Sequence, residues 1–156
     1  MAACAPPASQ PSAHETLELA VRADVTGIFP NPPIVNEAFS SELNRNIFEA
    51  LVRLDGDLRL VPALAQRWTN PAADTYVFEL KPGLRFSDGR PLTAEDVAAS
   101  IEAGRDWVYR ENFHSLASAR ALDERRVEIR TSASFPVLLT RLPWGLVVPR
   151  SSIGLR

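Results

Sequence analysis

The sequence predicts an α/β fold, because strand patterns and helix patterns follow one another along the chain. Apolar and polar residues alternate, as in half-buried strands, at residues 16–23, 75–80 and 126–131. Between the first two lies an apolar stripe at helical spacing, over residues 36–54, and between the last two a capped helix begins at Thr93.

The first 15 residues are mostly Ala, Pro, Ser and Gln, a composition that cannot bury a core, and we expect a flexible tail there. A strand over 16–23 leads into a loop with Gly27 and several prolines. Asn36 can cap the next helix, which we expect to end near Leu54. Its apolar stripe consists of Phe39, Leu43, Ile47 and Leu51.

A turn at residues 55–57 leads to a short predicted strand at 58–61. We expect residues 62–68 to form a helical turn with Trp68 anchored in the core, and 70–74 to form a loop. In the strand at 75–80 one face carries Tyr76, Phe78 and Leu80.

The segment 86–97 combines a strand end, a tight turn and a helix start. Asp88 and Gly89 suit the turn, and Pro91 interrupts strand pairing. Thr93 with Asp96 three residues later resembles a capping box, so a helix should begin at Thr93 and end near Gly104.

The C-terminal third is less regular. Residues 107–116 are ambiguous and could form an irregular helix, whereas 126–131 alternates as a half-exposed strand. We expect a helix over 135–142 and a last short strand over 146–148, closed by Pro149.

Several blocks resemble the bacterial family 5 extracellular solute-binding proteins, the peptide- and nickel-type receptors of ABC importers. The blocks are IFEALVRLD at 47–55, VPALA at 61–65 with Trp68, YVFELKPGLRF at 76–86 and FSDGRPLTAEDV at 86–97. The resemblance covers roughly residues 16–150. It implies a periplasmic-binding-protein type II-like fold, and family members are much longer than this chain.

The resemblance also implies a division of the chain. Residues 16–45 would begin lobe one, 46–150 would form the α+β domain that this family inserts, and 151–156 would be a C-terminal remnant after it. We therefore expect an N-terminal fragment of such a receptor, with one partial lobe.

The composition is that of a soluble globular protein. With 46% hydrophobic and 23% charged residues and a net charge of −2, it fits neither a disordered chain nor a nucleic-acid binder. No apolar run reaches the roughly 20 residues that span a bilayer.

Cys4 follows Ala2 and Ala3, which resembles the end of a bacterial lipoprotein signal whose cysteine carries the lipid. The alternative is an accidental cysteine. We expect a periplasmic or cell-surface protein, in line with the family resemblance, which would touch a membrane only through a lipid on Cys4.

Patterns for catalysis are weak. His14, His114 and Cys4 have no metal-ligand spacing, and the adjacent carboxylates Glu95 and Asp96 are explained by the helix start. The sequence has no nucleophile elbow and no phosphate-binding glycine loop. We predict a non-enzyme without a metal or cofactor.

The resemblance implies three groups of ligand-binding residues. The loop residues Phe29, Pro30 and Asn31 are one, and the alternative is a surface loop with a buried phenylalanine. The other two groups are the pair Trp144 and Gly145, with core packing as the alternative for Trp144, and the pair Phe113 and His114. Gly145 stands where an arginine would favour an anionic chelate, so a nickel ligand is not favoured.

We predict the substrate-binding component of an ABC importer, capturing peptides or similarly sized solutes outside the cytoplasmic membrane and delivering them to a permease. The alternative is a truncated stand-alone domain that acts as a protein interaction module. Because receptors of this type close two lobes on a ligand, we expect a fragment to bind its ligand very weakly or not at all. A fragment would also leave open strand edges and uncovered apolar faces, so we expect self-association or a disordered first strand.

Overall fold

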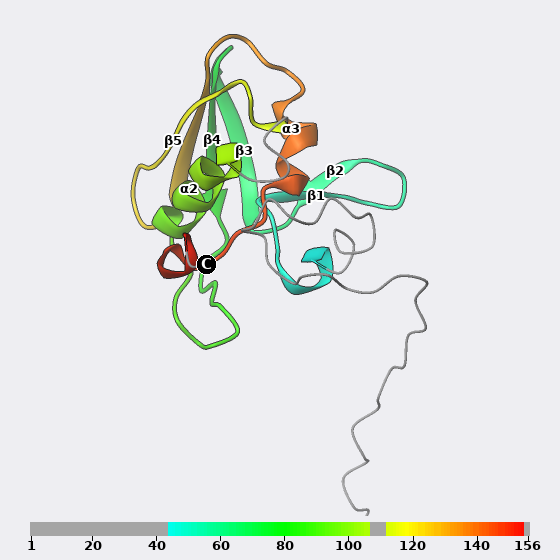
Figure 1. The fold of residues 1–156 in the computed structure, drawn as a ribbon. Helices are drawn as coiled ribbons and strands as arrows, with labels where there is room; N and C mark the ends of the chain where they lie inside the picture. Colours follow the sequence, from blue (N-terminus) through cyan, green and yellow to red (C-terminus); the bar gives the residue numbers. More distant parts are fainter. Residues whose placement is uncertain (1–43, 107–111, 155–156) are drawn as a thin grey trace, which may run out of the picture.

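A four-stranded antiparallel sheet forms one layer of the computed structural model, which describes residues 44–106 and 112–154 (Figure 1). The strands are β3 (Ala65–Ala72), β4 (Thr75–Leu80), β5 (Leu116–Ala121) and β6 (Arg126–Thr131). Their order in the sheet is β3-β4-β6-β5, so the chain leaves β4, passes through a helix and returns at the opposite edge.

The second layer contains the helices and a small hairpin. Helix α2 (Ala94–Ala103) packs against β5 and β6 and is followed by the 3-10 turn η1 (Gly104–Asp106). The hairpin consists of β1 (Val52–Leu54) and β2 (Leu60–Pro62). The C-terminal part contains α3 (Leu138–Arg141), η3 (Leu142–Trp144) and η4 (Arg150–Ser152).

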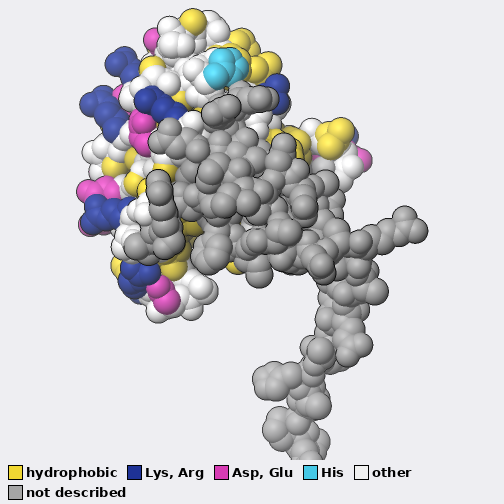
Figure 2. Space-filling view, in the orientation of Figure 1, with side chains coloured by type: hydrophobic (Ala, Val, Ile, Leu, Met, Phe, Trp, Pro, Cys, Tyr) yellow, Lys and Arg dark blue, Asp and Glu magenta, His cyan; other side chains and the backbone are white. Residues whose placement is uncertain are grey.

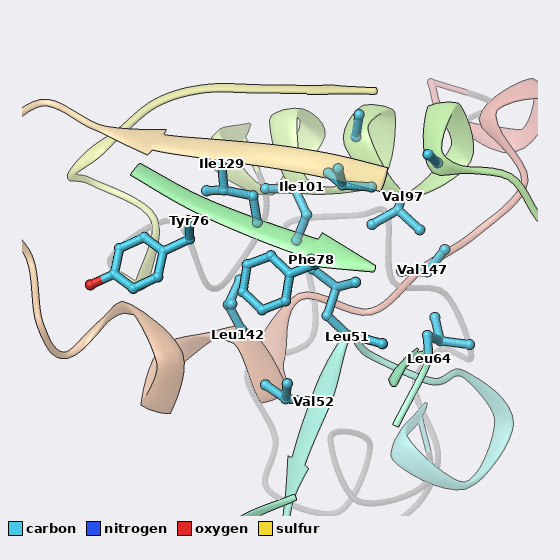
Figure 3. Packing of buried hydrophobic residues seen from close by; sticks show 14 of the residues in the cluster. Leu51, Val52, Leu64, Tyr76, Phe78, Val97, Ile101, Ile129, Leu142 and Val147 are labelled. Carbon is cyan, nitrogen blue, oxygen red and sulfur yellow. The ribbon is translucent and has the colours of Figure 1, made fainter. Parts of the chain in front are cut away.

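The hydrophobic core lies between these two layers (Figure 3). Phe78 and Ile129 from the sheet, Ile101 from α2, and Leu51 and Leu142 from the second layer are fully buried. The core joins segments that are far apart in the sequence, and it holds β1 against the segment that follows α3.

The outer face of the sheet is charged. Glu79 accepts hydrogen bonds from Gln66 and from Arg67, whose Nε lies 2.7 Å from Oε2. Glu128 likewise accepts from Arg120 at 2.8 Å. These arginines lower the pKa values of Glu79 and Glu128. Figure 2 shows basic and acidic side chains interspersed on the side of the molecule where β5 lies.

The strands predicted at 75–80 and 126–131 are confirmed, and so is the helix start at Thr93. Asp96 Oδ2 accepts from the Thr93 N–H at 3.0 Å and from the Thr93 hydroxyl at 2.9 Å. Gly89, in the predicted turn, has φ +86°, which only glycine adopts without strain.

The expected helix over residues 36–54 is wrong in its C-terminal part. Within the described residues the helix ends at Ile47, and β1 begins at Val52. The carbonyls of Ala50 and Leu51 accept hydrogen bonds from the N–H groups of Leu64 and Ala65, at 3.1 and 2.9 Å. Extended pairing with the start of β3 therefore replaces the last helical turns, and Ile47 is 52% exposed.

The expected helical turn over 62–68 is also wrong, because β3 occupies residues 65–72. Trp68 pairs with Phe78 across the sheet, with ring centroids 6.2 Å apart, and is half-buried rather than a core anchor. The loop expected over 70–74 is likewise wrong in its first part, because β3 continues to Ala72, and an edge strand such as β3 tolerates Pro71.

The segment 146–148 is buried but forms no strand. The backbone groups of Val148 instead form hydrogen bonds with the side chain of Ser100 on α2. The Ser100 hydroxyl donates to the Val148 carbonyl at 3.1 Å and accepts from the Val148 N–H at 3.0 Å. A helix side chain thus takes the place of a neighbouring strand.

In the C-terminal part, one predicted helix needs correction and one strand was not predicted. The helix expected over 135–142 is shorter, since α3 begins at Leu138. The strand β5 was not predicted, because its sequence LASARA is rich in Ala and Ser. The strand expected at 16–23, the N-terminal tail and residues 107–111 lie outside the described residues.

Candidate functional site

A groove of about 430 Å³ opens beside Trp144, where the second layer meets the end of the first described helix. Its walls come from the helix end, the chain leading into β1, β1 itself, and η3 with Leu146 shortly after it. The lining residues are Arg45, Asn46, Ile47, Phe48, Glu49, Ala50, Val52, Arg53, Leu54, Pro143, Trp144 and Leu146.

Two backbone features bring these walls together. The Val147 N–H donates to the Glu49 carbonyl at 2.9 Å, which ties the segment after η3 to the chain entering β1. The Gly145 N–H donates to the Leu142 carbonyl at 2.9 Å and closes the turn that carries Trp144.

The turn requires glycine at position 145 for reasons of space. A Cβ atom there would lie 2.8 Å from Ile101 Cδ1 and 3.1 Å from Phe113 Cζ. Gly145 is buried, so its role in this structure is to let the turn pack on the core.

The guanidinium of Arg45 lies over the indole of Trp144, with Cζ 3.7 Å from the ring centroid. This is a cation–π contact at close range. Arg45 is exposed and Trp144 is half-buried, so the stack forms a partly covered wall of the groove.

Basic residues outnumber acidic ones in the lining of the groove: Arg45 and Arg53 are basic, and Glu49 is acidic. None of these three takes part in an ion pair with another described residue. The other lining side chains are mainly apolar, so the groove offers apolar walls with a positive rim.

The structure separates the predicted ligand-binding residues. Trp144 lines the groove, and Gly145 lies beneath it. Phe113 is a core residue, 2% exposed, and the described groove does not include it. His114 is exposed and meets the Phe135 ring edge-on, with centroids 5.4 Å apart.

The remaining predicted site residues cannot be placed in this geometry. Phe29, Pro30, Asn31 and Cys4 lie outside the residues that the structure describes. Arg45 and Arg53 were missed by the sequence analysis. No local pattern marks them, because the groove forms only where the helix end and β1 meet η3, which is far away in the sequence.

Two other hollows are less suited to an organic ligand. One, of about 510 Å³, is lined by Glu79, Asp123, Glu124, Arg125 and Arg126, most of which pair with one another. A smaller one, of about 250 Å³, shares residues 47–49 with the groove and includes Asp88, whose pKa is lowered by its hydrogen bonds with Arg90.

Over residues 44–106 and 112–154, no three His, Cys, Asp or Glu side chains gather as a metal site would need. The helices in the same ranges are too short or too polar to cross a bilayer.

Comparison with solved structures places the fold among periplasmic receptors. OppA of Burkholderia pseudomallei superposes with a TM-score of 0.72 at 23% identity, over 85% of this chain and 30% of that chain. NikZ of Campylobacter jejuni, solved with Ni(L-His), gives a TM-score of 0.71 at 25% identity, over 83% of this chain and 26% of that chain. The predicted fold class is confirmed.

Sequence relatives point the same way. The probable deoxycholate-binding periplasmic protein YgiS of Escherichia coli is 28% identical over 141 residues, which is 76% of this chain and 26% of YgiS. The nickel-binding periplasmic protein of Escherichia coli is 26% identical, over 94% of this chain and 29% of the relative. The chain therefore spans about a quarter of the length of these relatives.

One family's sequence profile matches residues 59–150, more than half of the chain, and it is described as bacterial extracellular solute-binding proteins, family 5 Middle. The profile covers β3 to β6, α2 and the turn that carries Trp144. The chain belongs to the family 5 bacterial extracellular solute-binding proteins.

Proposed function

We propose that this chain is part of the substrate-binding component of an ABC importer that captures peptides or similarly sized solutes outside the cytoplasmic membrane. The family match over residues 59–150 carries this proposal. The relatives are named as binding proteins, which supports a binding role rather than an enzymatic one for this chain.

The groove beside Trp144 is our candidate for solute contact. Its volume of about 430 Å³ falls in the range typical of small-molecule sites, and an aromatic wall with a few polar groups is typical of such sites. We propose that Trp144 contacts the solute there, and that Phe29, Pro30, Asn31 and His114 also bind the ligand, as the family resemblance implies.

The chain spans about a quarter of the length of its relatives, so it would supply only part of the surface around a ligand. Because affinity depends on how much of a ligand is buried, we expect the chain alone to bind solutes weakly. Residues 46–150 would act as one domain in this role, and a lipid on Cys4 would hold the receptor at the membrane surface.

Deletion of the gene in its source bacterium tests the proposal. We expect the deletion strain to lose uptake of labelled peptides from a mixture of lengths, and a plasmid copy of the gene to restore it. Unchanged uptake of every peptide, together with the absence of permease and ATPase genes beside this gene, would favour the alternative of a protein interaction module.

A further inference from the structure

The stacked pair Arg45 and Trp144 has an arrangement that suits an anion. The indole covers one face of the guanidinium, with Cζ 3.7 Å from the ring centroid. Stacking fixes the plane of the guanidinium but leaves the N–H donors at its edge directed outward, since these donors lie in that plane.

The position of Arg45 in the groove makes these donors accessible to a small solute. Arg45 is exposed, lines the groove and forms no ion pair with another described residue. By contrast, Arg67 and Arg120 on the sheet each contact a glutamate, at 2.7 and 2.8 Å.

Apolar side chains lie beside this positive group. Ile47, Leu54 and Leu146 line the same groove, and the first two are 52% and 38% exposed. A ligand that carries a carboxylate next to an apolar group would therefore find both complements within one groove.

We propose that Arg45 is a specificity-determining residue that binds a carboxylate of the captured solute, with Trp144 holding its guanidinium in place. This inference rests on the proposed function and names the substrate class: solutes with a carboxylate adjoining an apolar side chain, such as the C-terminal residue of a peptide. A carboxylate matches the planar, two-pronged edge of a guanidinium and can accept two parallel hydrogen bonds from it.

The test is an NMR titration of the complete 156-residue chain, labelled with ¹⁵N. The two probes are N-acetyl-leucine, which carries a carboxylate, and N-acetyl-leucinamide, its neutral counterpart. We expect the carboxylate probe to shift the Trp144 indole N–H signal with a millimolar Kd. We expect the amide to bind about tenfold more weakly or not at all, since hydrogen bonds to charged groups are the stronger ones.

Two variants of Arg45 and one control variant locate the effect. Arg45→Gln should abolish the preference for the carboxylate, and Arg45→Lys should retain part of it, because lysine keeps the charge but loses the planar edge. Arg67→Gln, which removes an exposed arginine on the sheet, should bind both probes as the wild type does. A dispersed ¹⁵N spectrum of each variant shows that it is folded.

Equal shifts with both probes, an unchanged preference in Arg45→Gln, or no shift with either probe at tens of millimolar would each overturn the inference. These outcomes are distinguishable from a failure of the proposed function. If peptide uptake depends on the gene but Arg45 is not selective, only the role of Arg45 is lost. If Arg45 is selective but uptake is unaffected, the importer role is lost.

Discussion

Gly145 shows how a single residue fixes the geometry of the groove. A Cβ atom at this position would lie 2.8 Å from Ile101 Cδ1 and 3.2 Å from the Leu142 carbonyl oxygen. The substitution Gly145→Ala should therefore overpack the core and lower the unfolding free energy by about 1–3 kcal/mol. Urea denaturation followed by fluorescence measures this change.

Gly56→Ala is the matched control for Gly145→Ala, because a Cβ atom at position 56 would meet nothing within 4 Å. Its unfolding free energy should stay within about 0.5 kcal/mol of the wild type. If both alanine variants have the same stability, the close packing at Gly145 has no energetic consequence and our account of the turn is wrong.

At the residue scale the sequence predicts Trp144 and Gly145 as ligand-binding residues, but it does not predict how each of them packs. Trp144 lines the groove, whereas Gly145 contributes space for Ile101 and Phe113 rather than a surface. Arg45 was not predicted, since its contact with Trp144 joins residues that are far apart in the chain. Local patterns reveal caps and turns, but they do not reveal which distant side chains meet.

At the scale of elements, Asp96 joins the start of α2 to the C-terminal segment. Its carboxylate accepts from the Thr93 N–H at 3.0 Å and from the Arg150 N–H at 3.1 Å, and the residue is 7% exposed. Asp96→Ala should lower the unfolding free energy by about 2 kcal/mol, because it removes a helix cap and leaves two part-buried backbone donors without an acceptor.

The neighbouring Glu95→Gln is the control for Asp96→Ala. Glu95 pairs with Arg150 on the surface, and surface ion pairs contribute little. Urea denaturation should place this variant within about 0.5 kcal/mol of the wild type. A loss in Glu95→Gln as large as that in Asp96→Ala would show that the surface charge, and not the buried cap, joins the two elements.

The charged outer face of the sheet predicts how stability depends on pH. The pKa of Glu128 is lowered chiefly by its hydrogen bond from Arg120, and its side chain is 12% exposed. A carboxyl group with a lower pKa in the folded state binds fewer protons there than in the unfolded state. It therefore stabilises the fold above its unfolded pKa, and this contribution is lost as the pH falls through its folded pKa.

We expect the unfolding free energy of the wild type to fall below about pH 4.3, the usual pKa of glutamate. In Glu128→Gln this acid-dependent loss should be smaller, so that the two stability curves are separated at neutral pH and approach each other in acid. Arg120→Gln should have a similar effect, since it removes the partner. Parallel curves for Glu128→Gln and the wild type over the whole range, measured by urea denaturation, would contradict the account.

Strict alternation of apolar and polar residues explains why two strands were predicted with correct bounds. Phe78 in β4 and Val127 and Ile129 in β6 are all fully buried, so the apolar positions of the pattern correctly predict which face of each strand packs on the core. The segment 146–148 is buried but has a helix, not a strand, as its neighbour, and β5 has small residues that give little contrast. These errors arise because the residue pattern of a segment does not show which other element of the fold will lie beside it.

At the scale of the whole molecule, apolar side chains gather at the helix end and on the β1–β2 hairpin. Ile47, Leu54 and Leu58 are 52%, 38% and 78% exposed. Figure 2 shows hydrophobic side chains at the far end of this hairpin.

The edge strands β3 and β5 both contain register shifts, and β3 carries Pro71. These features disfavour pairing between sheet edges. We infer that the apolar surface, not a sheet edge, is where copies of the chain would meet.

We therefore expect the chain to self-associate as its concentration rises, which size-exclusion chromatography with light scattering measures. The triple variant Ile47→Gln, Leu54→Thr, Leu58→Asn should remain monomeric at concentrations where the wild type does not. Asparagine also suits position 58, where the backbone has φ +61°. The double variant Leu122→Gln, Val137→Gln removes exposed apolar side chains elsewhere and should associate as the wild type does. A monomeric wild type would contradict the expected self-association. Equal association of all three proteins would show that this surface does not drive it, because removing its hydrophobic area would then have changed nothing.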